Sequence, residues 1–167
     1  SVWLEEKQLI PFDLYLSIME EILLGLKALN SLGYSHSFLT PEEILLPLEW
    51  NSKTHVKLTN IGISTIVPSF LSKKEILKYR DSYFKESLFP ATTSLSVKED
   101  LYSFGVIMGK LLLICDSSIE GNKDTIQSYL DSLIDKNNSF NSIDEVLDLF
   151  EDIFKIYRKS FIIPKKD

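Results

Sequence analysis

The segment that decides the fold spans residues 24–46 and reads LGLKALNSLGYSHSFLTPEEILL. It joins the end of an apolar helical pattern to a polar loop and then to a short apolar run. Over 14–32, apolar side chains recur every three or four residues and predict a long amphipathic helix, which Gly33 is placed to end. The apolar face of this helix consists of Ile18, Ile22, Leu23, Leu26 and Leu29.

Two short apolar runs, at the end of this segment and beyond it, predict a small β-hairpin. Residues 44–46 and 56–59 have the composition of strands, and the turn-forming stretch 51–53 lies between them. Pro47 has no backbone N–H to donate to a ladder, so we expect it to mark a strand end or an edge.

A second long helix is predicted after residue 96, and its apolar side chains cover every side of the helix. Ser96 and Glu99 have the spacing of a capping box at its start. A helix that is apolar all round is buried in the middle of a domain. The apolar residues are Leu101, Tyr102, Phe104, Val106, Ile107, Met108, Leu111, Leu112, Leu113 and Ile114.

Two further amphipathic helices complete an architecture that is mainly α. One covers 126–134, and the other opens at Ser142, with Glu145 in the capping-box position, and runs to Tyr157. The sequence contains neither an internal repeat nor a low-complexity segment.

The composition is that of one ordinary globular domain. The 167 residues include 44% hydrophobic and 25% charged side chains, and the net charge of -6 argues against a nucleic-acid partner. The one cysteine, Cys115, excludes an internal disulfide, and we expect a small buried apolar residue there rather than a reactive thiol. No apolar run reaches the length of a membrane span and the start lacks a signal peptide, so we expect no membrane and a cytoplasmic or nuclear location.

The order of long helix, loop, hairpin, variable segment and buried helix resembles the C-terminal lobe of eukaryotic protein kinases. Residues 24–36 resemble the helix that leads into the kinase catalytic loop, and 39–46 resemble that loop's Leu-Lys-Pro-Glu-Asn-Ile-Leu-Leu continuation. Residues 56–64 resemble the strand that ends in the Asp-Phe-Gly magnesium motif. Residues 99–107 are similar to the start of the central kinase helix, and 142–147 to the last helical pattern of the lobe.

The resemblance implies a kinase-like C-terminal lobe that fills residues 1–167. Each motif alone is weak, but the set in this order covers nearly the whole chain. The glycine-rich loop, the strand Lys and the helix Glu of the N-terminal lobe have no counterpart here. The start at Ser1 suggests a fragment of a longer protein. A narrower resemblance is to the pseudokinase region of stress-responsive translation-factor kinases.

The positions that carry chemistry in the family are replaced. Residues 36–38 are His-Ser-Phe where an active kinase has His-Arg-Asp, so Phe38 stands at the catalytic Asp and cannot accept a proton. Thr40 replaces the Lys that neutralises phosphate charge, and Asn60 replaces the metal-motif Asp with a poorer ligand. Glu43 occupies the Asn position and offers a carboxylate. We therefore expect no catalytic residue and no metal, with Glu43 and Asn60 as weak metal candidates.

The positions that support the fold in the family are kept. The family's loop His packs into the hydrophobic spine, and the Asp at the start of the buried helix hydrogen-bonds the catalytic-loop backbone; His36 and Asp100 match these two positions. Gly62 keeps the backbone freedom of its motif. A catalytic pair formed by Glu42 and Glu43 is less favoured than a solvated or structural role for both.

Residues 62–86 correspond to the activation segment of the family. Of its closing Ala-Pro-Glu only Glu86 is kept, and the matching position of its Arg partner is Phe140. Because an unpaired buried carboxylate is costly, we expect Glu86 in solvent or beside Arg80 or Arg158. Without the loop Arg, a phosphate on this segment would miss its usual charge partner.

These residues predict a catalytically inactive kinase homologue. Its function would be a regulatory or scaffolding module that binds a protein partner or a neighbouring domain, within a larger protein that carries an active Ser/Thr kinase domain. No cofactor is expected. The alternative is an unorthodox kinase that binds ATP through an N-terminal lobe missing from this chain, with Glu43 and Asn60 holding Mg²⁺. A third is a structural domain that dimerises through apolar residues, for which Trp3 and Trp50 are candidates; the sequence leaves the oligomeric state open.

Overall fold

The architecture is mainly helical. The computed structural model describes residues 9–37, 39–50, 54–61, 97–115, 123–135 and 140–158. In chain order these residues form helix α2 (Phe12–Ser31), the 3₁₀ turn η1 (Pro41–Glu43), strands β1 (Ile44–Leu45) and β2 (Lys57–Leu58), and helices α5 (Val97–Leu112), α6 (Lys123–Ile134) and α7 (Ile143–Arg158). The expected helical class is confirmed, and it is compatible with a fragment like the C-terminal lobe of a kinase.

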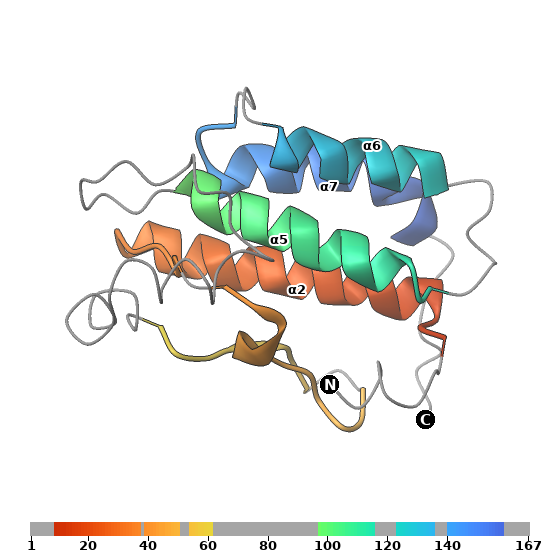
Figure 1. The fold of residues 1–167 in the computed structure, drawn as a ribbon, viewed down its shortest axis with the longest axis horizontal. Helices are drawn as coiled ribbons and strands as arrows, with labels where there is room; N and C mark the ends of the chain where they lie inside the picture. Colours follow the sequence, from red (N-terminus) through yellow and green to blue (C-terminus); the bar gives the residue numbers. More distant parts are fainter. Residues whose placement is uncertain are drawn as a thin grey trace, which may run out of the picture.

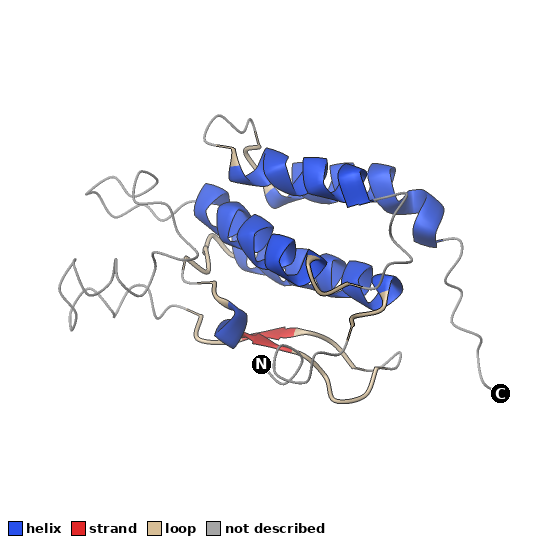
Figure 2. Ribbon diagram, turned by 45° about the vertical axis from the view of Figure 1, so that its right-hand side comes forward, coloured by secondary structure: helices blue, strands red, loops and turns tan. Residues whose placement is uncertain are grey.

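The helices pack on one another, and the hairpin covers one side of them. Figure 1 shows α2 and α5 running side by side, with α6 and α7 above them. Helix α5 contacts both α2 and α6, and α7 contacts α2. The hairpin lies on the opposite side from α6 and α7 (Figure 2), where β2 contacts α2.

Helix α2 ends where the sequence predicts. Gly33 adopts a φ of +80°, which a residue without a Cβ reaches at no steric cost. The Gly33 N–H donates to the Asn30 carbonyl at 2.9 Å, and the Tyr34 N–H donates to the Leu29 carbonyl at 3.1 Å. These two hydrogen bonds satisfy carbonyl groups that the end of the helix would otherwise leave without a donor. It turns the chain sharply into the loop that follows.

The buried face of α2 meets α5. The expected residues Ile18, Ile22 and Leu26 are in the core, whereas Leu29, near the end of the helix, is half-buried. Tyr15 is fully buried, and its hydroxyl donates to the Met108 carbonyl of α5 at 3.1 Å. Burial raises the pKa of the Tyr15 hydroxyl well above its ordinary value, because the charged form loses its water.

Helix α5 is buried over most of its surface, as expected, and it packs very closely on α6. A Cβ on Gly105 would lie 2.8 Å from a methyl carbon of Ile134 and 3.3 Å from the Cβ of Leu133. Any larger residue at this position would force Ile134 or the helices to shift, so glycine permits this close approach. The burial expected for Leu113 is wrong: its side chain is 75% exposed, because it follows the last residue of the helix.

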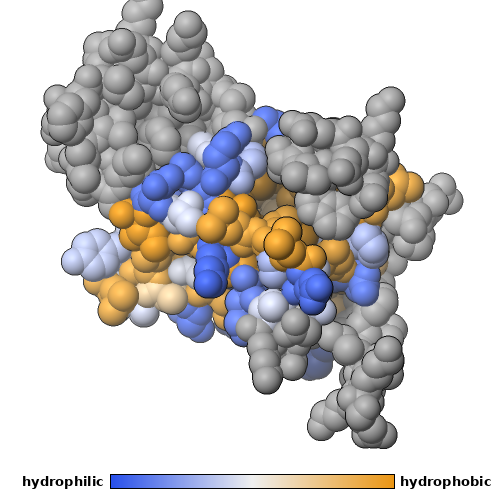
Figure 3. Space-filling model, turned by 90° about the horizontal axis from the view of Figure 1, so that it is seen from below, coloured by the Kyte–Doolittle hydropathy of each residue, from blue (hydrophilic) through white to orange (hydrophobic). Residues whose placement is uncertain are grey.

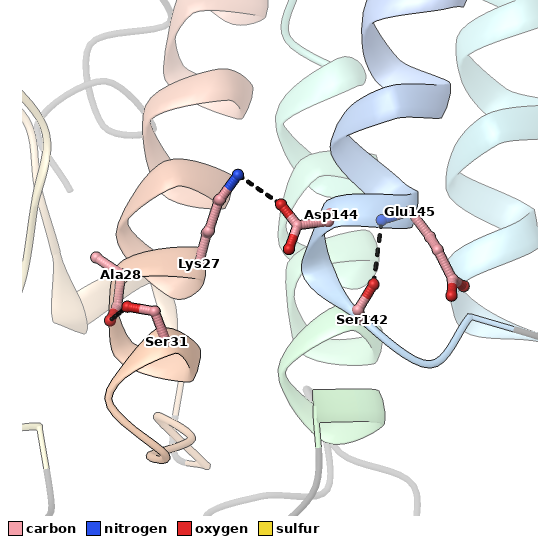
Figure 4. A network of polar contacts seen from close by, with 6 residues as sticks. All are labelled: Lys27, Ala28, Ser31, Ser142, Asp144 and Glu145. Atoms are coloured by element: carbon pink, nitrogen blue, oxygen red, sulfur yellow. Dashed lines mark hydrogen bonds and ion pairs between the residues drawn. The ribbon is translucent and has the colours of Figure 1, made fainter.

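Helix α7 begins at the predicted cap and closes the core. The Ser142 hydroxyl accepts a hydrogen bond from the Glu145 N–H at 3.3 Å, and the Glu145 carboxylate accepts one from the Asn141 N–H at 3.0 Å. Figure 4 shows the Ser142 cap beside an ion pair between Lys27 of α2 and Asp144 of α7. Ser96, the cap expected for α5, lies outside the described residues.

Aromatic side chains fill the space between α6 and α7. The Tyr129 ring packs edge-on against Phe154, with ring centroids 5.9 Å apart, and the Tyr129 hydroxyl donates to the Val146 carbonyl at 3.2 Å. Phe150 and Phe154 are also in ring contact, at 4.8 Å. Such pairs add to the stabilisation from apolar burial alone.

The hairpin has the predicted strands in an antiparallel register. Ile44 pairs with Leu58, and Leu45 pairs with Lys57. Pro47 lies beyond the end of β1, as predicted, because proline has no N–H to donate to a paired strand. Gly25 of α2 allows the hairpin to approach, since a Cβ there would lie 3.0 Å from a methyl carbon of Leu58. The hairpin is thereby seated on α2.

Candidate functional site

The site is the loop between α2 and β1, and its first part is held by Asp100. This residue lies in the first turn of α5, where a negative charge is favourable. One carboxylate oxygen of Asp100 accepts a hydrogen bond from the His36 N–H at 2.8 Å, and the other accepts one from the Ser37 N–H at 2.7 Å. The contact that the kinase resemblance implies for Asp100 is therefore present, while the assignment of Asp100 and His36 as kinase-fold positions stays a prediction.

Burial of Asp100 shapes its electrostatics. The residue is only 4% exposed, and loss of water raises the pKa of its carboxyl group above the ordinary value. The two backbone N–H donors, from Ser37 and His36, act in the opposite direction because they stabilise the charged form. Desolvation is the larger of these effects.

Ser37 has a backbone conformation that residues other than glycine seldom adopt. Its φ is 59°, in the left-handed region. A side chain in this region is disfavoured by about 1–2 kcal/mol, so the conformation persists only where neighbouring contacts hold it. The hydrogen bond from the Ser37 N–H to Asp100 is one such contact. The following residue, Phe38, which stands at the expected catalytic position, lies outside the described residues.

His36 connects the loop to the hairpin. Its ring is fully buried, and Nε2 lies 2.9 Å from the Thr59 carbonyl. A carbonyl only accepts hydrogen bonds, so Nε2 carries the proton and donates. The other ring nitrogen, Nδ1, has no hydrogen-bond partner in the part of the chain that the structure describes. The ring therefore serves as a structural donor, in agreement with the buried role expected for it.

Glu43 and Asn60, the two weak metal candidates, are brought together at the other end of the loop. The Asn60 amide nitrogen Nδ2 donates to Oε1 of Glu43 at 3.2 Å, and Glu43 is only 7% exposed. The Glu43 carbonyl accepts hydrogen bonds from the Thr59 N–H at 2.9 Å and from the Thr59 hydroxyl at 3.3 Å. Loop and hairpin are thus joined through Thr59 and Asn60.

These two side chains do not fit the divalent cation that the kinase resemblance implies. A hard cation requires several oxygen ligands. Toward the Glu43 carboxylate, Asn60 presents its N–H group instead of its oxygen. Among the described residues, no group of three or more His, Cys, Asp or Glu side chains is arranged to hold a metal ion. The pair is a hydrogen-bonded contact rather than a preformed metal site.

Thr40 and Glu42 interact locally within the loop. Thr40 is buried at the start of η1, and a hydrogen bond from its side chain lowers the pKa of Glu42. Glu43 faces Asn60. The carboxylates of Glu42 and Glu43 therefore have separate polar partners, and the absence of a catalytic pair stays a prediction.

Several expected residues lie outside the described part of the chain. Among them are Gly62, the activation-like segment with Arg80 and Glu86, and Trp3. Phe140 and Trp50 are described, and both are partly buried against the core. Cys115 is half-buried next to the end of α5, and its backbone forms an isolated parallel β-bridge with that of Ile10.

Glu21 is a site residue that the sequence did not reveal. Its carboxylate accepts hydrogen bonds from the Val56 N–H and from Nδ1 of His55, the latter at 3.1 Å. This gives a partner to His55, for which the sequence suggested no role. The signal that could have identified Glu21 is its place on α2, directly before the buried Ile22, where a carboxylate borders the apolar face.

Comparison with known proteins supports a kinase-like relationship. The chain is 33% identical over 81 residues to the cell cycle protein kinase DBF2 of Saccharomyces cerevisiae. The matched segment is 48% of this chain and 13% of that protein. It is 25% identical over 120 residues to the interferon-induced, double-stranded RNA-activated protein kinase of Rattus norvegicus, which covers 71% of this chain and 23% of that protein. No protein-family model matches the chain. The similarities are thus partial.

One further expectation concerns membranes. Among the helices within the described residues, none combines the length and the apolar character that crossing a bilayer requires.

Proposed function

We propose that the chain is a kinase-like module without phosphoryl-transfer activity, which regulates or scaffolds by binding a protein partner or a neighbouring domain. The observation that carries this proposal is the loop between α2 and β1. Its backbone is anchored by Asp100, while the described positions that would carry phosphoryl-transfer chemistry hold Thr40 and Asn60.

The chemistry of phosphoryl transfer supports this view. The reaction depends on positioning and on cationic or metal groups that neutralise the phosphate charge. Thr40 offers no positive charge, and its side chain forms a hydrogen bond with Glu42. The Asn60 amide bonds Glu43 through its N–H group. In the sequence, Phe38 replaces the group that would orient the substrate hydroxyl.

Exposed apolar side chains support a protein partner. Figure 3 shows apolar residues at the surface of the face that carries the hairpin, among polar ones. Apolar surface that gathers on one face is typical of contact sites. The large exposed apolar residues of the described part include Leu9, Leu24, Leu32, Tyr34, Leu45, Leu48, Ile61 and Leu113.

A transfer assay tests the proposal directly. The purified protein is incubated with labelled ATP, with Mg²⁺ or Mn²⁺ and with a general protein substrate. We expect no incorporation above that of a heat-denatured sample. Incorporation that disappears in the Glu43→Gln variant would contradict the proposal.

Affinity capture of partners from cell extract, followed by direct binding to each purified candidate, tests the interaction role.

A nucleotide-binding kinase is the second candidate. It is favoured by the partial similarity to two proteins named as kinases and by the Glu43 carboxylate at the expected metal position. A thermal-shift titration with Mg²⁺ and ATP separates the two, because a ligand that binds the folded state raises its melting temperature. Sedimentation at two concentrations tests the dimer interpretation, which a strictly monomeric protein would exclude.

A further inference from the structure

We propose that the Asn60 amide holds the Glu43 carboxylate in place of a cation, so that the loop and the hairpin are joined without any divalent metal. We call the side-chain pair of Glu43 and Asn60 the amide latch. The inference goes beyond the proposed function, because it concerns what joins the two segments and does not depend on which partner binds.

The first step is the direction of the hydrogen bond. A carboxylate oxygen can only accept, so the Asn60 group that faces Oε1 of Glu43 must be the N–H donor, at 3.2 Å. A cation shared by both residues would need the amide oxygen of Asn60 in that place. Binding of such a cation would therefore break the amide latch before any ligand bond could replace it.

The second step is that the backbone already places both partners. The Thr59 N–H donates to the Glu43 carbonyl at 2.9 Å, directly beside the paired strands. Asn60 has a φ of 56°, in the left-handed region that Asn and Asp enter more readily than most residues. The backbone hydrogen bond and the turn at Asn60 thus set the two side chains beside each other.

The third step concerns charge. Glu43 is 93% buried, since it is only 7% exposed, and its other oxygen, Oε2, has no hydrogen-bond partner among the described residues. Among the described residues, the amide is thus the one donor to this carboxylate. Position 60 is exposed, so a second carboxylate there would place a solvated like charge beside the buried Glu43 carboxylate, which is unfavourable unless a cation or a proton joins them.

The test compares melting temperatures in EDTA and in MgCl₂, with ionic strength matched by KCl so that general screening is equal. For the wild-type protein we expect the same melting temperature in both solutions. A wild-type protein that melts clearly higher in MgCl₂ would overturn the proposal.

Asn60→Asp is the main variant, because it adds a charge while keeping the backbone preference of Asn. In EDTA we expect its melting temperature to fall by about 2–4 °C or more, and MgCl₂ to restore most of the loss. A variant with wild-type melting temperature in EDTA would contradict the amide latch.

The reversed pair, Glu43→Gln with Asn60→Asp, is the matched control. Its Gln amide can donate to the Asp carboxylate, so the hydrogen bond returns with opposite direction. We expect a melting temperature in EDTA above that of Asn60→Asp, and no response to MgCl₂. If Asn60→Asp does not fold in EDTA, the double variant still tests the proposal. Failure of the double variant to fold in EDTA would count against the amide latch.

Failure of the amide latch and failure of the proposed function are distinguishable. Magnesium dependence of the wild-type melting temperature without ATP would overturn the amide latch alone. Phosphate transfer in the labelling assay would overturn the proposed function alone. Circular dichroism of each variant before melting confirms that the helices have formed.

Discussion

The two ends of the loop at residues 36–43 are both held by a carboxylate, but in different ways. At the first end, Asp100 reaches from α5 and accepts two backbone N–H groups at 2.8 and 2.7 Å. At the second end, Glu43 accepts one side-chain N–H from Asn60 at 3.2 Å. Backbone donors are present whatever the side chains are, whereas the Asn60 donor depends on residue type. The first end can therefore keep its shape while the loop's side chains change.

The largest effect should come from Asp100→Asn. An amide has one acceptor oxygen, so either the His36 or the Ser37 N–H must face another donor. We expect a loss of about 1–3 kcal/mol in the free energy of unfolding, measured by urea titration. The matched control is Asp148→Asn on the exposed face of α7, which should stay within about 0.5 kcal/mol of wild type. Equal values for the two variants would show that the two backbone hydrogen bonds to Asp100 add no measurable stability.

The pH dependence of the Asp100 contribution sharpens the same point. Burial raises the pKa of the folded-state carboxyl above that of the unfolded chain, so the folded state binds the proton more tightly. Its stabilising contribution is then fully present below the unfolded pKa, at about pH 4, and is lost as the pH rises through the folded pKa. The advantage of wild type over Asp100→Asn should shrink in urea titrations from about pH 4 to neutrality. An advantage that grows over this range would show that the two N–H donors outweigh burial.

Ser37 tests whether the first end stores backbone strain. Ser37→Ala and Ser37→Gly both remove the hydroxyl, but only glycine accepts a φ of 59° without steric cost. We expect Ser37→Gly to be the more stable of the two by about 0.5–1 kcal/mol, after allowance for glycine's entropy in the unfolded chain. At the exposed helical Ser17 the order should reverse, with alanine better by about 1 kcal/mol. The same order at both positions would exclude strain at Ser37.

The smallest effect should come from Glu43→Gln. The Gln carbonyl can still accept from the Asn60 amide, so we expect a change below about 0.5 kcal/mol in the free energy of unfolding. The same carboxylate-to-amide change is thus predicted to be costly at Asp100 and nearly neutral at Glu43. A loss at Glu43 as large as that at Asp100 would mean that the second carboxylate oxygen also has a donor.

Much of the fold could be predicted because its signals are local. The apolar spacing over 14–32, the glycine at 33 and the Ser142 cap each depend on residues a few positions apart, and each is found in the structure. The prediction that Leu113 is buried was wrong because the helix ends at Leu112. An apolar pattern does not mark a helix end to within one residue.

The site was predictable only in part. The contact of Asp100 with the loop backbone followed from the kinase resemblance. The bond of Asn60 to Glu43 and the role of Glu21 depend on how the hairpin lies against α2, which no local pattern contains. The left-handed Ser37 was also missed, since serine carries no signal for a positive φ.

Thr59 has a consequence for measurement. Its N–H donates to Glu43 and its carbonyl accepts from His36, so one residue of the hairpin contacts both ends of the loop. Exchange of this amide proton with deuterated solvent requires its bond to Glu43 to open. A single resonance of Thr59, followed over time by NMR, would therefore report how often the Glu43 end of the loop opens from the hairpin, without any substitution in the loop itself.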